Sequence, residues 1–477
     1  MTNDNENILA SSPSYSVAYK AWFLFLLVLI YACSFLDRII TAVVAQPMKI
    51  DLGLTDFQVG LLGGLAFALL YTFAGIPLGR LAESRRRVRI ITVCIVAWSA
   101  FAALCGTAQN FWQMVFFRAG VGVGEAGGTP SAHSLIADHF APARRATALS
   151  IYALGVPVGV LAAAFGGGWV AQHLGWRLAF MVLGVPGLAL GLLALLTLRE
   201  PPRGFSEGKH GSVSAEVPSF VSVIKRLWQM KGARHMIIAI GIGSFAVQAI
   251  NQFIPIYIAR VFGLGVARAG FTFGVIVGVG GFIGIGLGGT LADWLAPRDK
   301  RWYAWVPGLA TVIAVPLGWF AFQCDRFNLA IPAIFLFSTL VMTWNGPTFA
   351  VAHGVVGPRM RASATVVVLM VMSLVGAGLG PAAIGFASDW FAARVFSGAG
   401  NYLQVCLPHA LKTPALALAC AQASASGIRS GMLSFSIFLA WAAGHYLWAS
   451  HWMRQQLPLQ PLHSHHGLVE AVAEAES

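Results

Sequence analysis

The feature that most constrains this chain is a series of long apolar segments with almost no charged residues. Charged residues make up only 10% of the chain, against about a quarter in an ordinary soluble domain. Each segment matches the ~20 residues that a helix needs to cross a bilayer. We therefore predict an all-α membrane protein with twelve transmembrane helices, at residues 19–46, 55–79, 88–108, 110–136, 146–172, 176–198, 233–261, 267–291, 303–323, 328–352, 361–388 and 428–452.

A polar stretch rich in proline and glycine divides these helices into six and six. Within it, residues 220–230 have the pattern of a short amphipathic helix that lies on the membrane surface. The predicted organisation is an N-terminal tail, a six-helix bundle, a linker, a second six-helix bundle and a C-terminal tail, at residues 1–18, 19–198, 199–232, 233–452 and 453–477.

The positive charge of the chain is a topology signal. A formal net charge of +13 could indicate a nucleic-acid or anionic-lipid partner. Most of the lysines and arginines, however, lie in short loops on one side of the apolar segments, which is the positive-inside pattern. We therefore expect both termini in the cytoplasm and no nucleic-acid partner. The first 20 residues lack the features of a cleaved signal, so helix 1 should be retained.

Two cysteines share the predicted loop before the last helix. With this orientation Cys406 and Cys420 lie on the outer side, where they could form a disulfide if the compartment is oxidising. The other four cysteines are expected to be ordinary apolar packing residues.

Two motifs recur about 210 residues apart, at equivalent places in the two halves. Residues 79–83 (Gly-Arg-Leu-Ala-Glu) follow helix 2, and residues 289–293 (Gly-Thr-Leu-Ala-Asp) follow helix 8. A second pair of similar stretches, 142–148 and 358–364, leads into helices 5 and 11. The halves should therefore be two pseudo-symmetric bundles, an arrangement that many secondary transporters use to hold a site between repeats.

These motifs carry a family resemblance. Residues 79–87 resemble the loop motif of the major facilitator superfamily, with Glu83 in place of the usual aspartate. With Asp37-Arg38, residues 118–126 and residues 289–303, the chain most resembles the bacterial members of the Spinster family. The resemblance implies a monomeric, alternating-access transporter of the bacterial inner membrane, with lysophospholipids or sphingoid phosphates as substrates.

The resemblance also implies a set of gating residues. The loop acids Glu83 and Asp293 should each contact the N-terminus of a helix in the opposite half, where the helix dipole favours an anion. Such contacts would hold the cytoplasmic side shut. The alternative is that these are solvated loop charges. The neighbouring basic residues of the predicted gate are Arg87, Arg145, Arg301 and Arg361.

Four charged residues lie at mid-membrane depth: Asp37, Arg38, Arg118 and Glu125. Each costs about 2.5–3.5 kcal/mol if it faces lipid. Arg118 and Glu125 are two turns apart on one face of helix 4, and the helix 1 pair falls at the same depth. We therefore expect the four to meet, either as a static salt-bridge cluster or, as charges at this depth more often are, as a functional site.

The chemistry of each charge suggests a role. A movement that separates a buried acid from an arginine drives proton uptake, so Asp37 and Glu125 are the predicted proton carriers. The planar guanidinium of Arg38 suits a phosphate headgroup. Arg118 either shares that task or pairs with Glu125.

The second half has no Asp, Glu, Lys or Arg deep in its helices. Gln248, Asn251 and Gln252 share a face of helix 7, and Asn345 lies in helix 10. Substrate contact and interhelical hydrogen bonding are both open for these amides. A cavity charged on one side and apolar on the other suits an amphiphilic anion with one acyl chain.

Three other functions are open for this chain. A proton-linked carrier of organic acids or drugs, a facilitative lipid transporter and a scramblase are the alternatives. The sequence contains no phosphate-binding Gly-Lys-Ser/Thr loop, no convincing metal-ligand cluster and no nucleophile elbow. We therefore expect no enzyme activity, no cofactor and no metal. The expected partners are protons, membrane lipid and the amphiphilic substrate.

Overall fold

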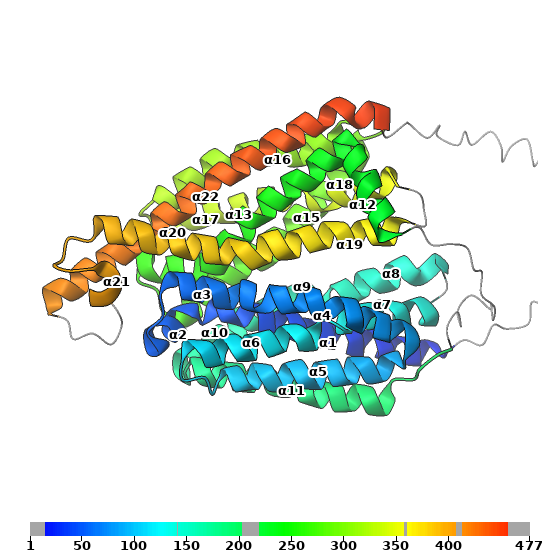
Figure 1. Ribbon diagram of the computed structural model, residues 1–477, viewed down its shortest axis with the longest axis horizontal. Coiled ribbons are helices and arrows are strands. Elements are labelled where there is room, and N and C mark those ends of the chain that lie inside the picture. The colour runs from blue at the N-terminus through cyan, green and yellow to red at the C-terminus, as the bar shows by residue number, and fades with distance from the viewer. Residues whose placement is uncertain (1–14, 141, 203–218, 357–359, 407–412, 457–477) are drawn as a thin grey trace, which may run out of the picture.

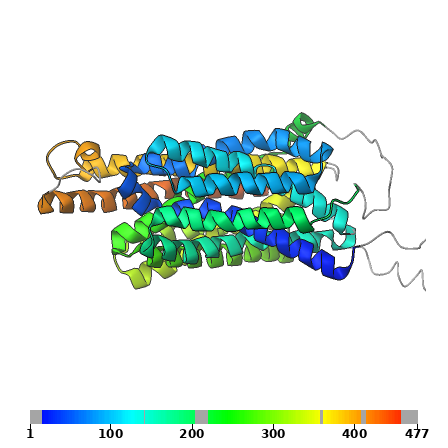
Figure 2. The same ribbon diagram turned by 90° about the horizontal axis from the view of Figure 1, so that it is seen from below.

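The structure is a computed structural model that describes residues 15–140, 142–202, 219–356, 360–406 and 413–456. These residues form helices and connecting loops, with no β-strand among them. The helices run along the long axis in two bundles, one from the N-terminal half (blue to green) and one from the C-terminal half (green to red) (Figure 1). The view from below shows the same lengthwise course (Figure 2). The predicted all-α fold is confirmed.

The N-terminal half contains α1 (Val17–Val43), α2 (Ala45–Leu52), α3 (Asp56–Gly63), α4 (Leu65–Ser84), α5 (Arg87–Cys105), α6 (Phe111–Glu125), α7 (Gly128–His139), α8 (Pro142–Ala153), α9 (Gly155–Leu161), the π-helical turn η2 (Ala162–Gly167), α10 (Gly168–His173) and α11 (Trp176–Thr197).

The C-terminal half contains α12 (Phe220–Gln229), α13 (Lys231–Phe262), α14 (Val266–Phe273), η4 (Gly274–Val279), α15 (Gly280–Leu295), α16 (Trp302–Gln323), α17 (Phe327–Val341), α18 (Asn345–Gly354), α19 (Arg361–Val371), η6 (Met372–Leu379), α20 (Gly380–Val395), α21 (Tyr402–Val405) and α22 (Pro414–Gln456). The helix α12 is the predicted amphipathic helix, with Val223 and Leu227 buried against the bundle.

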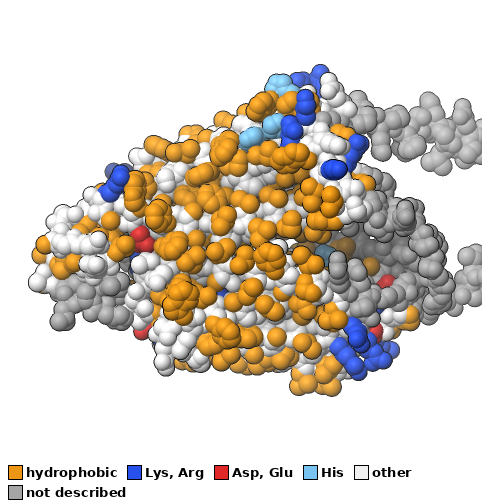
Figure 3. All heavy atoms as spheres, viewed as in Figure 1, with side chains coloured by type: hydrophobic (Ala, Val, Ile, Leu, Met, Phe, Trp, Pro, Cys, Tyr) orange, Lys and Arg blue, Asp and Glu red, His pale blue; other side chains and the backbone are white. Residues whose placement is uncertain are grey.

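The membrane spans follow the apolar segments closely. Within the described residues, 11 helical segments are long and apolar enough to cross a bilayer. The remaining predicted segment, 110–136, is divided into α6 of 15 residues and α7 of 12, which are separated by a turn. Neither piece is long enough alone, but they follow one another along the bundle (Figure 1). Apolar side chains cover the middle of the visible face (Figure 3), as expected of a multi-pass membrane protein.

The last helix begins earlier than predicted. Helix α22 starts at Pro414, whereas the sequence prediction placed 414–427 in a loop. This stretch is rich in alanine and leucine, which are strong helix formers, so it continues the membrane helix. Cys420 therefore lies in a helix, and it forms a disulfide with Cys406 at the end of α21, with a Cα–Cα distance of 5.5 Å.

We name the two ends of the molecule by what they carry. The linker end is the right-hand end in Figure 1, where α11 ends and α12 begins. The network end is the opposite one, where α1 and α13 end, and it is named for the ionic network of Asp56, Arg260 and Asp389 described below. Helices α4 and η6, α9 and η4, and α10 and α14 pack together between the halves.

Each of the four segments that meet between the halves contains an irregular turn. Helices α3 and α4 are separated at Gly64, and π-helical turns widen the other three segments at η2, η4 and η6. Such turns are frequent at functional sites, because the helical hydrogen bonding is locally loosened. Four segments that contact the opposite half thus have a local break in their helical hydrogen bonding.

The halves approach most closely near the network end. A Cβ added at Gly60 of α3 would lie 2.0 Å from the carbonyl oxygen of Pro381 in α20. A Cβ at Gly385 of α20 would lie 2.2 Å from the carbonyl oxygen of Asp56. The two backbones are thus in direct contact, and only glycine allows this separation.

Candidate functional site

The four mid-depth charges lie together inside the N-terminal half. Asp37, Arg118 and Glu125 are 2%, 1% and 2% exposed, respectively, and the Arg38 side chain is 25% exposed. Helix α1 brings Asp37 and Arg38, and α6 brings the other two. None of the four lies on a lipid-facing surface apart from the others.

The strongest contact in this cluster joins Arg38 and Glu125. Both Nε and Nη2 of Arg38 lie 2.7 Å from Oε2 of Glu125. The Ser34 hydroxyl donates to the same oxygen over 2.8 Å. The other oxygen, Oε1, is buried without a hydrogen-bond partner. Charge-assisted bonds of this kind are about twice as strong as neutral ones, so this pair is a strong link between α1 and α6.

Arg118 has different partners from those that its spacing suggested. Its Nη1 donates to the backbone carbonyl of Asp37 over 3.0 Å, and its Nε to that of Leu62 over 3.4 Å. The pairing of Arg118 with Glu125, one of the two sequence-based alternatives, is not formed in this conformation. Arg118 instead ties α6 to α1 and α3 through backbone oxygens.

Aromatic rings surround the Arg38 guanidinium. Its carbon lies 5.1 Å from the Phe35 ring centroid, 5.0 Å from that of Phe67 and 4.7 Å from that of Tyr71. Such cation–π contacts stabilise a cation away from water. A guanidinium has five N–H donors, and Glu125 uses one edge. The exposed part of the side chain can therefore bind another anion.

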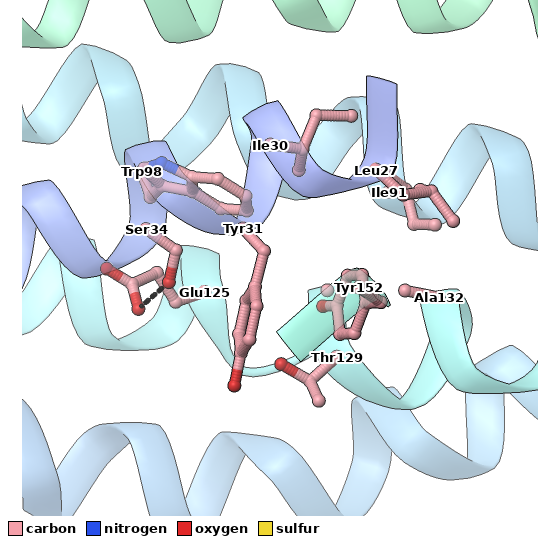
Figure 4. A pocket seen from close by; sticks show the side chains of 11 residues that line it. Leu27, Ile30, Tyr31, Ser34, Ile91, Trp98, Glu125, Thr129, Ala132 and Tyr152 are labelled. Atoms are coloured by element: carbon pink, nitrogen blue, oxygen red, sulfur yellow. Dashed lines mark hydrogen bonds between the residues drawn. The ribbon is translucent and has the colours of Figure 1, made fainter. Parts of the chain in front are cut away.

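A small pocket adjoins Glu125 inside the N-terminal half (Figure 4). It has room for roughly one water molecule. Its polar lining includes Ser34, Thr129 and Tyr152, and the Trp98 ring covers one side. The Glu125 carboxylate is thus bordered by hydroxyl groups as well as by the arginine. This pocket could not be predicted from the sequence, because its residues come from five different helices.

The amides predicted in the second half are spread over different environments. Gln252 is buried against Gly63 of α3, and its Nε2 has no hydrogen-bond partner. Gln248 lies one turn closer to the linker end and is exposed. Asn251 and Asn345 are half-buried. Gln252 is therefore the amide that the structure brings against the opposite half.

Three of the predicted gating residues have described side chains, and their described contacts lie within their own halves. Arg87 is buried, and it bonds to Glu200 over 2.8 Å and to Asp138. Asp293 accepts a bond from the Tyr303 hydroxyl over 3.0 Å.

Arg301 likewise bonds to Asp299 over 2.9 Å, in its own half. The N-terminus of helix 5, which Asp293 is predicted to contact, begins at residues whose side chains lie outside the described part of the structure, so this contact stays a prediction. The side chains of Glu83, Arg145 and Arg361 lie outside the described part of the structure.

An ionic network that sequence reasoning missed joins the halves at the network end. Asp56 of α3 bonds to Arg260 of α13, to Lys49 over 2.6 Å and to Ser388 of α20 over 2.7 Å. Asp389 of α20 accepts bonds from the first backbone N–H groups of α3, over 3.2 and 2.9 Å. A carboxylate at a helix N-terminus is stabilised by the helix dipole. Asp389 thus caps a helix of the opposite half.

Comparison with known proteins identifies the family. The sequence model for the Major Facilitator Superfamily matches residues 27–381. The chain belongs to the Major Facilitator Superfamily.

Solved structures and curated relatives place the chain near Spinster within this superfamily. A bacterial homolog of the human lysosomal transporter Spinster, crystallised in an inward-facing, unoccupied conformation, is 31% identical. The match covers 94% of this chain and 100% of that one, with a TM-score of 0.85. The predicted Spinster resemblance is confirmed.

Curated relatives include an MFS-type efflux pump of Mycolicibacterium smegmatis, 29% identical over 76% of this chain and 83% of that protein. They also include the sphingosine-1-phosphate transporter SPNS2 of Mus musculus, 28% identical over 75% of this chain and 67% of that protein. As a superfamily member related to Spinster, this chain is a membrane transporter and not an enzyme.

Proposed function

We propose that this chain is a proton-coupled, alternating-access transporter of an amphiphilic anion such as a lysophospholipid or a sphingoid phosphate. The observation that carries the proposal is the buried Arg38–Glu125 pair, whose arginine remains partly exposed. The name of the mouse relative, a sphingosine-1-phosphate transporter, supports a lipid phosphate as substrate.

The pair suggests how substrate and proton are linked. A phosphate that binds the free edge of Arg38 competes with Glu125 for the guanidinium. A buried carboxylate that loses its cation is costly, so it takes up a proton. Asp37, 2% exposed in the same cluster, is the second proposed proton carrier. Binding of the anion to Arg38 and protonation of Glu125 are then coupled to each other.

The second half would hold the apolar part of the substrate. Gln248 and Asn251 offer polar contacts on α13, and Gln252 and Asn345 complete the set of proposed substrate contacts. The sequence of this half has no Asp, Glu, Lys or Arg deep in its predicted helices. An acyl chain there would meet no ion, whereas a free sugar would lack most of its hydrogen bonds.

We place the termini in the cytoplasm and the network end outside a bacterial inner membrane. The Cys406–Cys420 disulfide lies beyond the network end, and disulfides persist in oxidising compartments. In this orientation the ionic network shuts the outer side, in line with the inward-facing state of the bacterial Spinster homolog.

Uptake into proteoliposomes tests the proposal. We expect saturable uptake of a sphingoid phosphate that accelerates with an inward proton gradient, and no uptake of the same headgroup without an acyl chain. Arg38→Ala should abolish uptake, and Glu125→Gln should retain substrate binding but lose the response to the gradient. Equal uptake with and without the acyl chain would exclude this substrate class.

A second candidate is a proton-linked carrier of drugs or organic acids. The relative of M. smegmatis named as an efflux pump favours it. In the same assay this candidate predicts gradient-driven transport of cationic dyes or small organic acids, unaffected by an excess of sphingoid phosphate. A facilitative carrier or scramblase predicts lipid movement that ignores the proton gradient, and a scramblase predicts movement that does not saturate.

A further inference from the structure

A group of basic and aromatic side chains lies at the linker end of the C-terminal half, far from Arg38. Lys231, Arg234 and His235 share one face of α13, at its first turns. On α22, Trp441, His445, Trp448 and Trp452 lie at helical spacing on the side next to them. We call this group the basic aromatic face. Histidine and basic side chains are visible together there in Figure 3.

The rings of this face form a continuous stack. The His235 ring lies 5.2 Å from that of His445, 4.8 Å from that of Trp448 and 5.2 Å from that of Trp452. Trp441 and Trp448 are 56% and 53% exposed. Exposed tryptophans beside a membrane helix end are typical of the interface, where lipid headgroups lie.

Cations border this stack. The Lys231 ammonium lies 5.7 Å from the Trp452 ring, and the Arg234 guanidinium lies 5.9 Å from the Trp228 ring of α12. Lys231 is exposed and Arg234 half-buried. No carboxylate pairs with either in the described ion pairs, so both charges are available to an anion.

The two histidines add a directed donor. Their Nδ1 atoms lie 2.9 Å apart, so one must donate and the other accept. The ring that accepts at Nδ1 carries its proton on Nε2 and can donate it to an outside partner, whereas the Nε2 of the other ring is an acceptor. Histidine is a costly residue to place beside hydrocarbon, and His445 is half-exposed on α22. A ligand with acceptor oxygens at headgroup depth would explain why a histidine stands at this position.

We propose that the basic aromatic face binds an anionic phospholipid of the surrounding membrane. Its phosphate lies against Lys231 and Arg234, within reach of the histidine pair, and its acyl chains lie along Trp448 and Trp441. Basic pockets between membrane helices bind anionic headgroups in this way. Helix α22 packs on α13, α16 and α20, on the side turned away from the N-terminal half (Figure 1). The bound lipid is therefore distinct from the transported substrate.

Native mass spectrometry of the full-length protein tests this, with phosphatidylglycerol as the probe and phosphatidylcholine as its neutral counterpart. We expect one phosphatidylglycerol to bind at least about tenfold more tightly than phosphatidylcholine. Lys231→Ala/Arg234→Ala should remove that preference. His235→Phe/His445→Phe keeps the ring stack. It should weaken the binding of phosphatidylglycerol and leave the binding of phosphatidylcholine unchanged.

The matched control is Arg298→Ala/Lys300→Ala. These two cations lie at the same end and also contact aromatic rings, at 4.5 and 5.9 Å, but without a histidine pair. This control variant should still bind one phosphatidylglycerol tightly. Equal loss in both double variants would reduce the effect to general surface charge and overturn the proposal, as would equal binding of the two lipids. Arg38→Ala should leave this lipid bound.

Discussion

Arg260 and Asp56 lie in opposite halves of the chain and form a two-bond ion pair. Nη1 of Arg260 lies 2.7 Å from Oδ2 of Asp56, and Nη2 lies 2.6 Å from Oδ1. The two side chains are 6% and 2% exposed. Screening by salt is weak at such burial, so this pair is a strong link between the two halves at the network end.

Replacing Arg260 by lysine should weaken this link between the halves. Lysine keeps the charge but cannot make two parallel bonds, and the loss of one charged bond costs about 1.5–3 kcal/mol. We expect at least a tenfold shift toward molecules open at the network end. Spin labels at Thr107 and Gln323, both exposed there in opposite halves, would report a longer distance by electron–electron double resonance.

The control for this experiment is Arg268→Lys, at an exposed arginine of α14 near the same end. It should leave the distance distribution unchanged. An unchanged distribution in Arg260→Lys as well would show that the ion pair does not hold the end shut.

The contact between α3 and α20 should be equally sensitive to one added methyl group. Gly60→Ala places a Cβ 2.0 Å from the Pro381 oxygen, so the two helices must separate. In a variant lacking Cys33, Cys94, Cys105 and Cys324, a cysteine at Ala382 should react about tenfold faster with a water-soluble maleimide when Gly60→Ala is added. Gly75→Ala, whose Cβ meets no atom within 4 Å, should not change the rate.

The charge of Arg38 should not be sufficient for transport. Arg38→Lys keeps a cation beside Glu125 but loses the planar fork and most of the ring contacts. We expect at least a tenfold lower transport rate, with the melting temperature of the purified protein little altered. Arg144→Lys, at an exposed position, is the control. A variant of Arg38 that transports normally would remove the phosphate-binding role.

Asp299 gives a prediction about pH. Hydrogen bonds from Arg454, and then from Arg301, hold the pKa of this loop carboxyl below its ordinary range. A lowered pKa means that the stabilisation is complete above the unfolded value of about 3.9 and is lost as the pH falls below it. Asp299→Asn should lower the melting temperature by a constant amount between pH 5 and 8. The difference from the unaltered protein should shrink below pH 4.

The fold could be predicted because long apolar segments have few alternatives in a bilayer. The mid-depth charges could be found for the same reason, since an ion there is costly wherever it faces lipid. Their partners could not: Arg118 bonds to backbone oxygens, and helical spacing does not distinguish a carbonyl from a carboxylate.

The ionic network was missed because Asp56, Arg260 and Asp389 stand at or beyond the ends of predicted helices, where charges usually face water. The sequence does place two acids and one base near the same end of the predicted bundles, on segments of both halves. This was the signal that could have predicted the network. The domain boundaries stay predictions.

The early start of α22 gives the molecule a feature that is useful for aligning particle images. About 14 extra residues at ~1.5 Å each carry this helix some 20 Å past its expected start, and the disulfide anchors α21 beside it. Small membrane proteins built from two similar halves are hard to orient in electron micrographs. This one-sided projection (Figure 1) distinguishes one half from the other, so particle images could be aligned without a bound antibody fragment.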